Sequence, residues 1–167
     1  MTAMLRNATT STDTATLMRR GMLVIGGLGV AGTTAELIFL RHWQSTLQLI
    51  AWPPMAALVM ALLLIARHPT RRSVRWAQGL GTSVLLVAGI GVIVHVAQNL
   101  ASGPLDRDYS AIWDTLSPVQ QLWTAATGGV GPAPALAPAA IAWTALILLL
   151  ATVRHPALDM TDAPAPR

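Results

Sequence analysis

The chain has 167 residues, of which 53% are hydrophobic and only 11% are charged, and its formal net charge is +4. A soluble domain carries roughly 25% charged residues, so this composition favours long apolar segments over a water-exposed globule. Cysteine is absent, which excludes disulfides, thiolate metal sites and cysteine nucleophiles.

Four apolar segments follow one another along the chain. Residues 1–20 are polar and rich in Thr and Ser, and they predict a disordered tail. The first apolar segment contains about 20 residues, or about 30 Å of helix, which matches the thickness of a hydrocarbon core. The second and fourth have prolines near their start, where the missing N–H costs least. We therefore expect an all-α fold, a four-transmembrane-helix bundle with one membrane domain (21–156), spans at about 21–40, 49–66, 79–98 and 135–153, and a second disordered tail (157–167).

The arginines predict the orientation of these spans. Nine of the eleven fall in the segments before the first span, between the second and third, and after the fourth, and only Arg41 and Arg107 fall in the other two connections. Cytoplasmic loops carry the positive excess, so both termini are expected in the cytoplasm. All basic residues are arginine, and Ala, Gly and Pro are abundant, which is typical of a GC-rich bacterial genome. We expect the bacterial plasma membrane, with the lipid bilayer as partner and no nucleic acid, because no basic face with interleaved aromatics is present.

A cleaved signal peptide is the alternative interpretation of the first span. Arg19 and Arg20 precede an apolar stretch that ends at Thr33-Thr34-Ala35, which fits cleavage before Glu36. The stretch is long for a signal peptide and three further spans follow it, so an uncleaved first helix is favoured. The orientation of the later spans is the same in both cases.

The two halves of the chain resemble each other, which suggests a parallel duplication of a two-helix unit. Each half contains a Gly-x-Gly-Val sequence, beginning at Gly27 and Gly89, and each ends on Arg-His-Pro, at 67–69 and 154–156. Chance similarity between apolar sequences is the alternative. The glycines of the first and third spans permit close helix approach, so we expect these two helices at the centre and the Leu-rich second and fourth facing lipid.

The connection between the third and fourth spans, about 99–134, is too long for a plain linker. Apolar residues at helical spacing from Ile112 to Trp123 predict a partly helical extracytoplasmic loop, and Pro118 divides it into two short turns. We expect Trp113 and Trp123 at the level of the lipid headgroups. A lid packed on the bundle is the alternative.

Candidate functional residues cluster near the extracytoplasmic ends of the first and third spans. Glu36 and His95 are the ionisable residues inside spans, where such groups normally face a bundle interior. His42 follows the first span, and Asn99 lies one helical turn beyond His95 on the same face. We therefore expect Glu36, His42, His95 and Asn99 to meet at one depth.

Three interpretations fit this cluster. In the structural one, Glu36 pairs with His95 or Arg41, and Asn99 caps a helix end. In the second, Glu36 and His95 form a ligand- or proton-binding site. In the third, His42 and His95 ligate a transition metal or haem, because imidazoles suit zinc, copper and iron. His68 and His155 would supply a second pair at the cytoplasmic face, an arrangement that resembles transmembrane haem-binding electron carriers.

The sequence contains no phosphate-binding glycine loop, no nucleophile elbow and no H-E-x-x-H motif. An enzyme is therefore disfavoured. We expect a small multi-pass membrane protein that acts as a non-enzymatic subunit or binding protein, with other membrane subunits or further copies of itself as partners. The alternative is a haem- or metal-binding membrane electron carrier.

Overall fold

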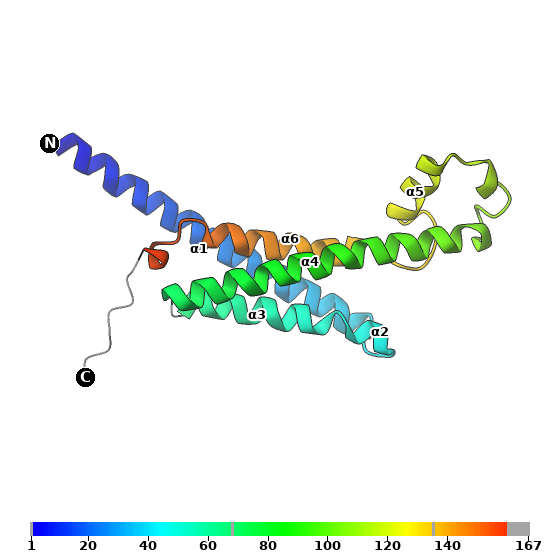
Figure 1. Cartoon of the computed structure of the whole chain (residues 1–167), viewed down its shortest axis with the longest axis horizontal. Coiled ribbons are helices and arrows are strands. Elements are labelled where there is room, and N and C mark those ends of the chain that lie inside the picture. Colours follow the sequence, from blue (N-terminus) through cyan, green and yellow to red (C-terminus); the bar gives the residue numbers. More distant parts are fainter. Residues whose placement is uncertain (1, 68, 135, 160–167) are drawn as a thin grey trace.

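The structure is a computed structural model that describes residues 2–67, 69–134 and 136–159. Within these ranges the chain is helical and contains no strand, so the expected all-α fold is confirmed (Figure 1). The α-helices are α1 (Thr2–Phe39), α2 (Thr46–Leu49), α3 (Trp52–Arg67), α4 (Arg71–Ser102), α5 (Pro118–Ala126) and α6 (Leu136–Thr152). Three short 3-10 turns lie at Gly103–Leu105, Trp113–Thr115 and Pro156–Leu158.

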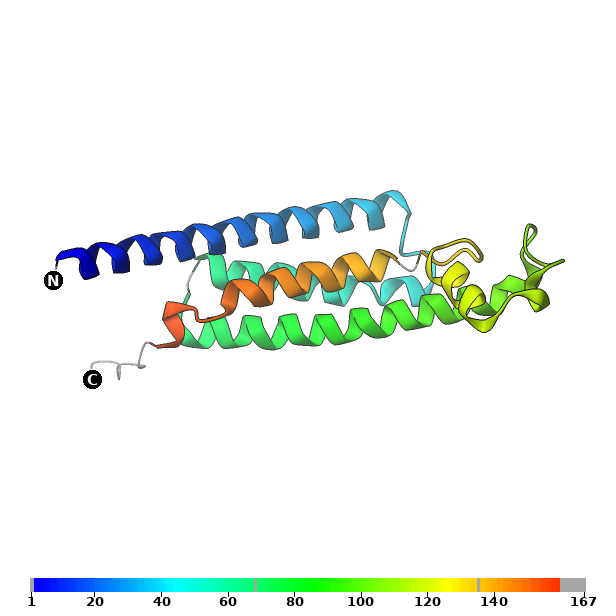
Figure 2. The same ribbon diagram turned by 90° about the horizontal axis from the view of Figure 1, so that it is seen from above.

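Helices α1, α3, α4 and α6 form an up-and-down bundle (Figures 1 and 2). Each packs against its neighbours in the ring α1–α3–α4–α6, and the contact between α1 and α3 is the least extensive. Helices α3 and α6 also touch across the diagonal, whereas α1 and α4 have no extensive contact. The prediction that the first and third apolar helices form the centre is therefore wrong, because these two helices, α1 and α4, do not pack extensively against each other. The expectation that the second and fourth face lipid stays a prediction.

The glycines of α1 and α4 led to the wrong prediction that these two helices pack against each other, because in the structure they contact α6. A β-carbon on Gly29 of α1 would lie 2.6 Å from the Thr144 hydroxyl of α6, and one on Gly26 would lie 3.2 Å from Leu148. On α4, β-carbons at Gly81 and Gly91 would meet α6 side chains at 3.0 and 3.1 Å. Small residues do allow close approach, but both helices use them against α6. A glycine in the sequence therefore indicates a position of close helix packing but does not indicate which helix packs there.

The described parts of the two predicted disordered tails contain helical residues. Helix α1 begins at Thr2, so the described part of residues 1–20 is helical. No proline interrupts this segment, and extending a helix that already exists costs far less than nucleating one. At the other end, Pro156–Leu158 forms a 3-10 turn with Ala157 buried, and residues 160–167 lie outside the described residues.

In the part of the chain that the structure describes, two helical stretches are long and apolar enough to cross a membrane, namely Asp13–Phe39 and Arg71–Leu105. Helices α3 and α6 are also apolar but shorter, with 16 and 17 residues. Large apolar side chains cover the outward surface of the whole bundle. They include Val24, Ile25 and Leu28 on α1, Val59, Met60 and Leu63 on α3, Leu86, Ile90 and Ile93 on α4, and Trp143, Leu146 and Leu150 on α6.

Residues 103–134 form a small distal subdomain beyond the end of the bundle, where α4 continues past its neighbours (Figure 1). Its core contains Trp113, Ala125 and Val130, and the Trp113 ring covers Gly103, whose missing β-carbon leaves the room for it. Ser117 caps α5 by forming a capping box with Gln120, and Pro118 is the first residue of the helix. A short turn, Trp113–Thr115, precedes it, so the predicted division into two short helical segments is confirmed. Trp113 is 5% exposed, so it packs inside the subdomain and does not face the lipid headgroups as expected. Trp123 is 71% exposed, and its headgroup position stays a prediction.

Candidate ligand site at the distal end of the bundle

A cavity of about 130 Å³ lies among α1, α3, α4 and α6 near their distal ends. Its walls are mostly apolar and include Leu37, Pro54, Ala88, Gly91 and Ile141. A wider hollow of about 490 Å³ shares part of this lining and extends along α4. The polar groups at the cavity come from Thr33, Glu36, His42 and His95 and from the backbone.

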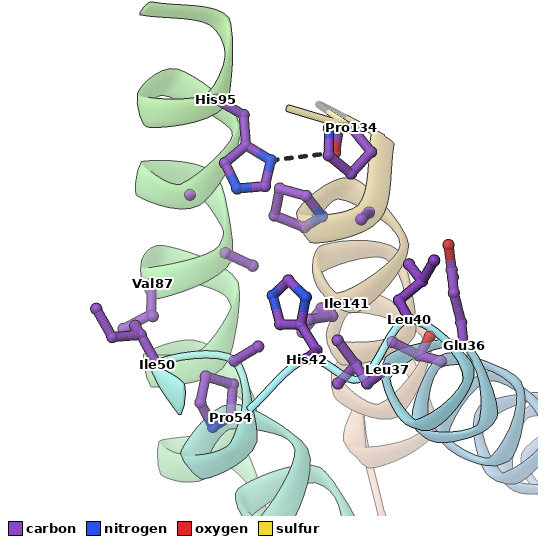
Figure 3. A pocket seen from close by; sticks show the side chains of 16 residues that line it. Glu36, Leu37, Leu40, His42, Ile50, Pro54, Val87, His95, Pro134 and Ile141 are labelled. Atoms are coloured by element: carbon purple, nitrogen blue, oxygen red, sulfur yellow. Dashed lines mark hydrogen bonds between the residues drawn. The ribbon is translucent and has the colours of Figure 1, made fainter. Parts of the chain in front are cut away.

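His95 projects from α4 across the cavity mouth toward the segment that precedes α6 (Figure 3). Its Nδ1 lies 3.1 Å from the carbonyl oxygen of Pro134. A carbonyl oxygen only accepts hydrogen bonds, so the ring donates its Nδ1–H here. In the neutral imidazole this leaves Nε2 as an acceptor.

His42 is placed by the way α1 ends. Arg41 has φ of 49°, in the left-handed region, and the next amide, that of His42, donates to the Leu37 carbonyl at 2.8 Å. This bond closes the helix in the manner of a Schellman cap. The Trp52 indole then donates to the His42 carbonyl at 2.8 Å, which ties the turn to the start of α3. Figure 3 shows the His42 ring pointing toward His95 from the opposite side of the cavity.

Glu36 contributes to the rim but not to a polar cluster. It is exposed, and Figure 3 shows its carboxylate beside Leu40, away from both imidazoles. Within the described residues its carboxylate forms neither an ion pair nor a hydrogen bond, so the expected pairing with His95 or Arg41 is absent there. The structure thus brings His42 and His95 to one cavity and leaves Glu36 at its edge.

Asn99 is fully buried and faces the distal subdomain instead of the cavity. Its Nδ2 donates to the carbonyls of Ala125 at 3.0 Å and Ala133 at 2.8 Å, and its Oδ1 accepts from the Ala133 amide at 3.0 Å. Gly131, at φ of 75°, passes so close to Asn99 that a β-carbon would clash with it. Asn99 is therefore a clasp for the segment 131–134, which we call the strap, and not the helix cap expected from the sequence.

The strap is the part of the site that sequence reasoning missed. It supplies the Pro134 carbonyl to His95, and Pro134 lines the cavity. A backbone carbonyl carries no signal in side-chain patterns. The one available hint was the pair His95 and Asn99, four residues apart on one helix face, because both side chains contact the strap.

The described residues contain no group of three or more His, Asp or Glu side chains arranged to hold a metal ion. His155 lies at the opposite end of the bundle, where its Nδ1 accepts the Ala157 amide at 3.2 Å. Burial lowers the pKa of His155 below its usual value, and the nearby positive charge of Arg19 contributes a smaller decrease. His68, its expected partner, lies outside the described residues.

The distal site thus offers an apolar cavity, two imidazoles that face it and an exposed carboxylate at the rim. Such a mostly apolar hollow with few polar groups is typical of a small-molecule binding site. In comparisons with known proteins, no family model, no curated protein and no solved structure matches the chain.

Proposed function

We propose that the protein crosses the bacterial plasma membrane four times, with both termini in the cytoplasm, and binds a small apolar ligand in the distal cavity. Only 22% of the apolar window of α1 and 17% of that of α4 are buried within the chain. A core helix of a soluble protein would be mostly covered by its neighbours, because exposed apolar patches of this size cause association in water. Lipid is the environment that suits such faces.

The two shorter helices support the same placement. Helices α3 and α6 are about 24–26 Å long at 1.5 Å per residue, slightly less than a hydrocarbon core of about 30 Å. They pack in the ring with α1 and α4, so a bilayer that encloses the longer helices also encloses them. Arg67 ends α3, Arg71 begins α4 and Arg154 follows α6, all at the end opposite the distal subdomain. This basic end suits the cytoplasm.

The observation that carries the binding function is the cavity between four apolar helices with His42 and His95 facing it. The wider hollow along α4 shares His42, Gly91 and His95 with it, and we infer that a ligand dissolved in the outer half of the bilayer enters from that side. The residues that line this site include only one carboxylate, Glu36, so they do not form the carboxylate pair used in general acid–base catalysis, which favours a binding protein or subunit over an enzyme.

Reporter fusions test the topology. Alkaline phosphatase fused after Asp106 should be active, and the same enzyme fused after Arg75 should be inactive. The reverse pattern would place the cavity on the cytoplasmic side and overturn the proposed orientation.

Cavity filling tests the binding. Ala88 is buried and lines the cavity, whereas the adjacent Gly89 has open space where a side chain would go. A small apolar ring compound such as 4-propylanisole should raise the unfolding temperature of the wild type and of Gly89→Leu, but not of Ala88→Leu. An equal rise in all three proteins would show that the compound acts through the lipid or another surface.

Electron transfer through a bound metal or haem is the second candidate function, favoured by the two imidazoles at one cavity. An absorption spectrum and metal analysis of the purified protein decide between the two candidates. A haem spectrum or stoichiometric metal that disappears in His42→Ala and His95→Ala would establish the carrier and displace the apolar-ligand proposal.

A further inference from the structure

We propose that the ligand of the distal cavity is a ring compound with a hydroxyl group, and that this hydroxyl donates a hydrogen bond to Nε2 of His95. This inference rests on the proposed binding function and specifies the chemistry of its ligand. Three features carry it: the hydrogen bond that selects the tautomer of the neutral His95 ring, the size of the cavity and the absence of arginine from its lining.

The first feature is the tautomer of His95. Its Nδ1–H is committed to the Pro134 carbonyl, 3.1 Å away. That carbonyl cannot easily move, because Asn99 holds the adjacent Ala133 by both its amide and its carbonyl. The neutral ring therefore keeps its proton on Nδ1 and presents Nε2 as an acceptor. A group that only accepts, such as an ether or a ketone, gains no hydrogen bond from this nitrogen, whereas a hydroxyl does.

The second feature is size. A protein cavity of about 150 Å³ with apolar walls is known to bind benzene, and the distal cavity has about 130 Å³. One six-membered ring is therefore about the largest rigid group that it takes. The adjoining hollow of about 490 Å³ shares His42 and His95 and leaves room for an apolar chain attached to the ring.

The third feature is charge. None of the residues that line the cavity is Arg, and Arg41 is exposed outside it. An anionic ligand would lose its hydration without gaining a guanidinium partner there, which is costly in a low-dielectric site. The Glu36 carboxylate points away from the imidazoles, so a cationic ligand gains little as well. A neutral hydroxyl avoids both costs.

Two matched probes test this assignment. 4-Propylphenol carries a hydroxyl, and 4-propylanisole replaces it with a methyl ether that cannot donate. Each is titrated into the full-length protein in lipid nanodiscs, and binding is read from the backbone amide resonances of Val87 and Gly91, with empty nanodiscs correcting for partition into lipid. One neutral hydrogen bond predicts about 2- to 10-fold tighter binding of the phenol to the wild type.

Two variants locate the acceptor. In His95→Asn, the side-chain amide can still donate to Pro134 while the Nε2 acceptor is lost, so the preference for the phenol should fall to about 1-fold. In His42→Phe the preference should persist. Loss of the preference in His42→Phe but not in His95→Asn would overturn the assignment to His95.

The two levels of the proposal fail differently. Saturable binding of both probes with equal affinity to the wild type would overturn the hydroxyl inference and leave the apolar site standing. Absence of saturable binding for both probes would overturn the proposed function itself, and the hydroxyl inference with it.

Discussion

Removal of the Asn99 side chain should detach the distal subdomain from the bundle. Asn99→Ala deletes three hydrogen bonds, two to Ala133 and one to the carbonyl of buried Ala125. A neutral hydrogen bond contributes about 1 kcal/mol net, and a buried polar group left without a partner costs about 1–3 kcal/mol. Water can reach half-buried Ala133 after the change but not Ala125, so the expected total loss is about 2–4 kcal/mol.

Hydrogen exchange measured by mass spectrometry detects this loss of stability locally, in the distal subdomain. Protection of peptides from residues 103–134 should fall about 30- to 1,000-fold, because each 1.4 kcal/mol corresponds to a factor of ten. Protection within the middle of α4 should stay unchanged, since the bundle core does not include Asn99. Gln98→Ala is the matched control, because Gln98 is exposed on the adjacent position. Unchanged exchange of the subdomain in Asn99→Ala would refute the clasp.

Three further predictions concern the bundle and its ends. Gly29→Val should destabilise the protein by about 1–3 kcal/mol through overpacking against α6, whereas Gly27→Val, which meets open space, should change the unfolding temperature little; equal effects would contradict the packing. Burial and the Arg19 charge lower the pKa of His155, so the unfolded chain takes up the proton before the folded chain as the pH falls below about 6.5. The unfolding temperature of the wild type should therefore drop between pH 7.5 and 5.5, and that of His155→Gln should drop by less. Identical pH profiles would show that His155 does not contribute. Arg41→Gly should be neutral or stabilising by up to about 1 kcal/mol, because glycine adopts the left-handed turn without strain, and a clear loss of unfolding temperature would mean that the arginine side chain itself matters.

Much of the local structure could be predicted because it depends on neighbouring residues. The apolar segments became α1, α3, α4 and α6, and Pro118 began a new helix after a short turn. The segment before Gly21 was judged by its polarity alone, yet α1 continues through it, because a helix once formed extends cheaply into residues that contain no proline.

The positions of the candidate residues were predicted in part, and their function stays a proposal. His42 and His95 share the cavity, as expected. His42 follows α1 and His95 lies in the distal part of α4, and the order of the apolar segments along the chain already predicts that these two regions lie at the same end of the bundle. Glu36 lines the same cavity but its carboxylate points away from both imidazoles, because a small change in helix rotation moves a side chain from the interior to the rim. The role of Asn99 depends on the strap, which lies 34 residues further along the chain at Ala133.

The sequence by itself determined that the chain is all-helical, where the apolar helices run, which positions permit close packing and which end of the bundle is basic. These properties follow from composition, from helical periodicity and from proline and glycine chemistry, all of which act over a few residues. Only the tertiary structure decided that α6 is the helix against which the glycines of α1 and α4 pack, that Trp113 is buried and that a backbone carbonyl fixes the His95 ring. Such choices depend on helix rotation and on contacts between distant segments, because several apolar faces of similar composition compete for the same partners.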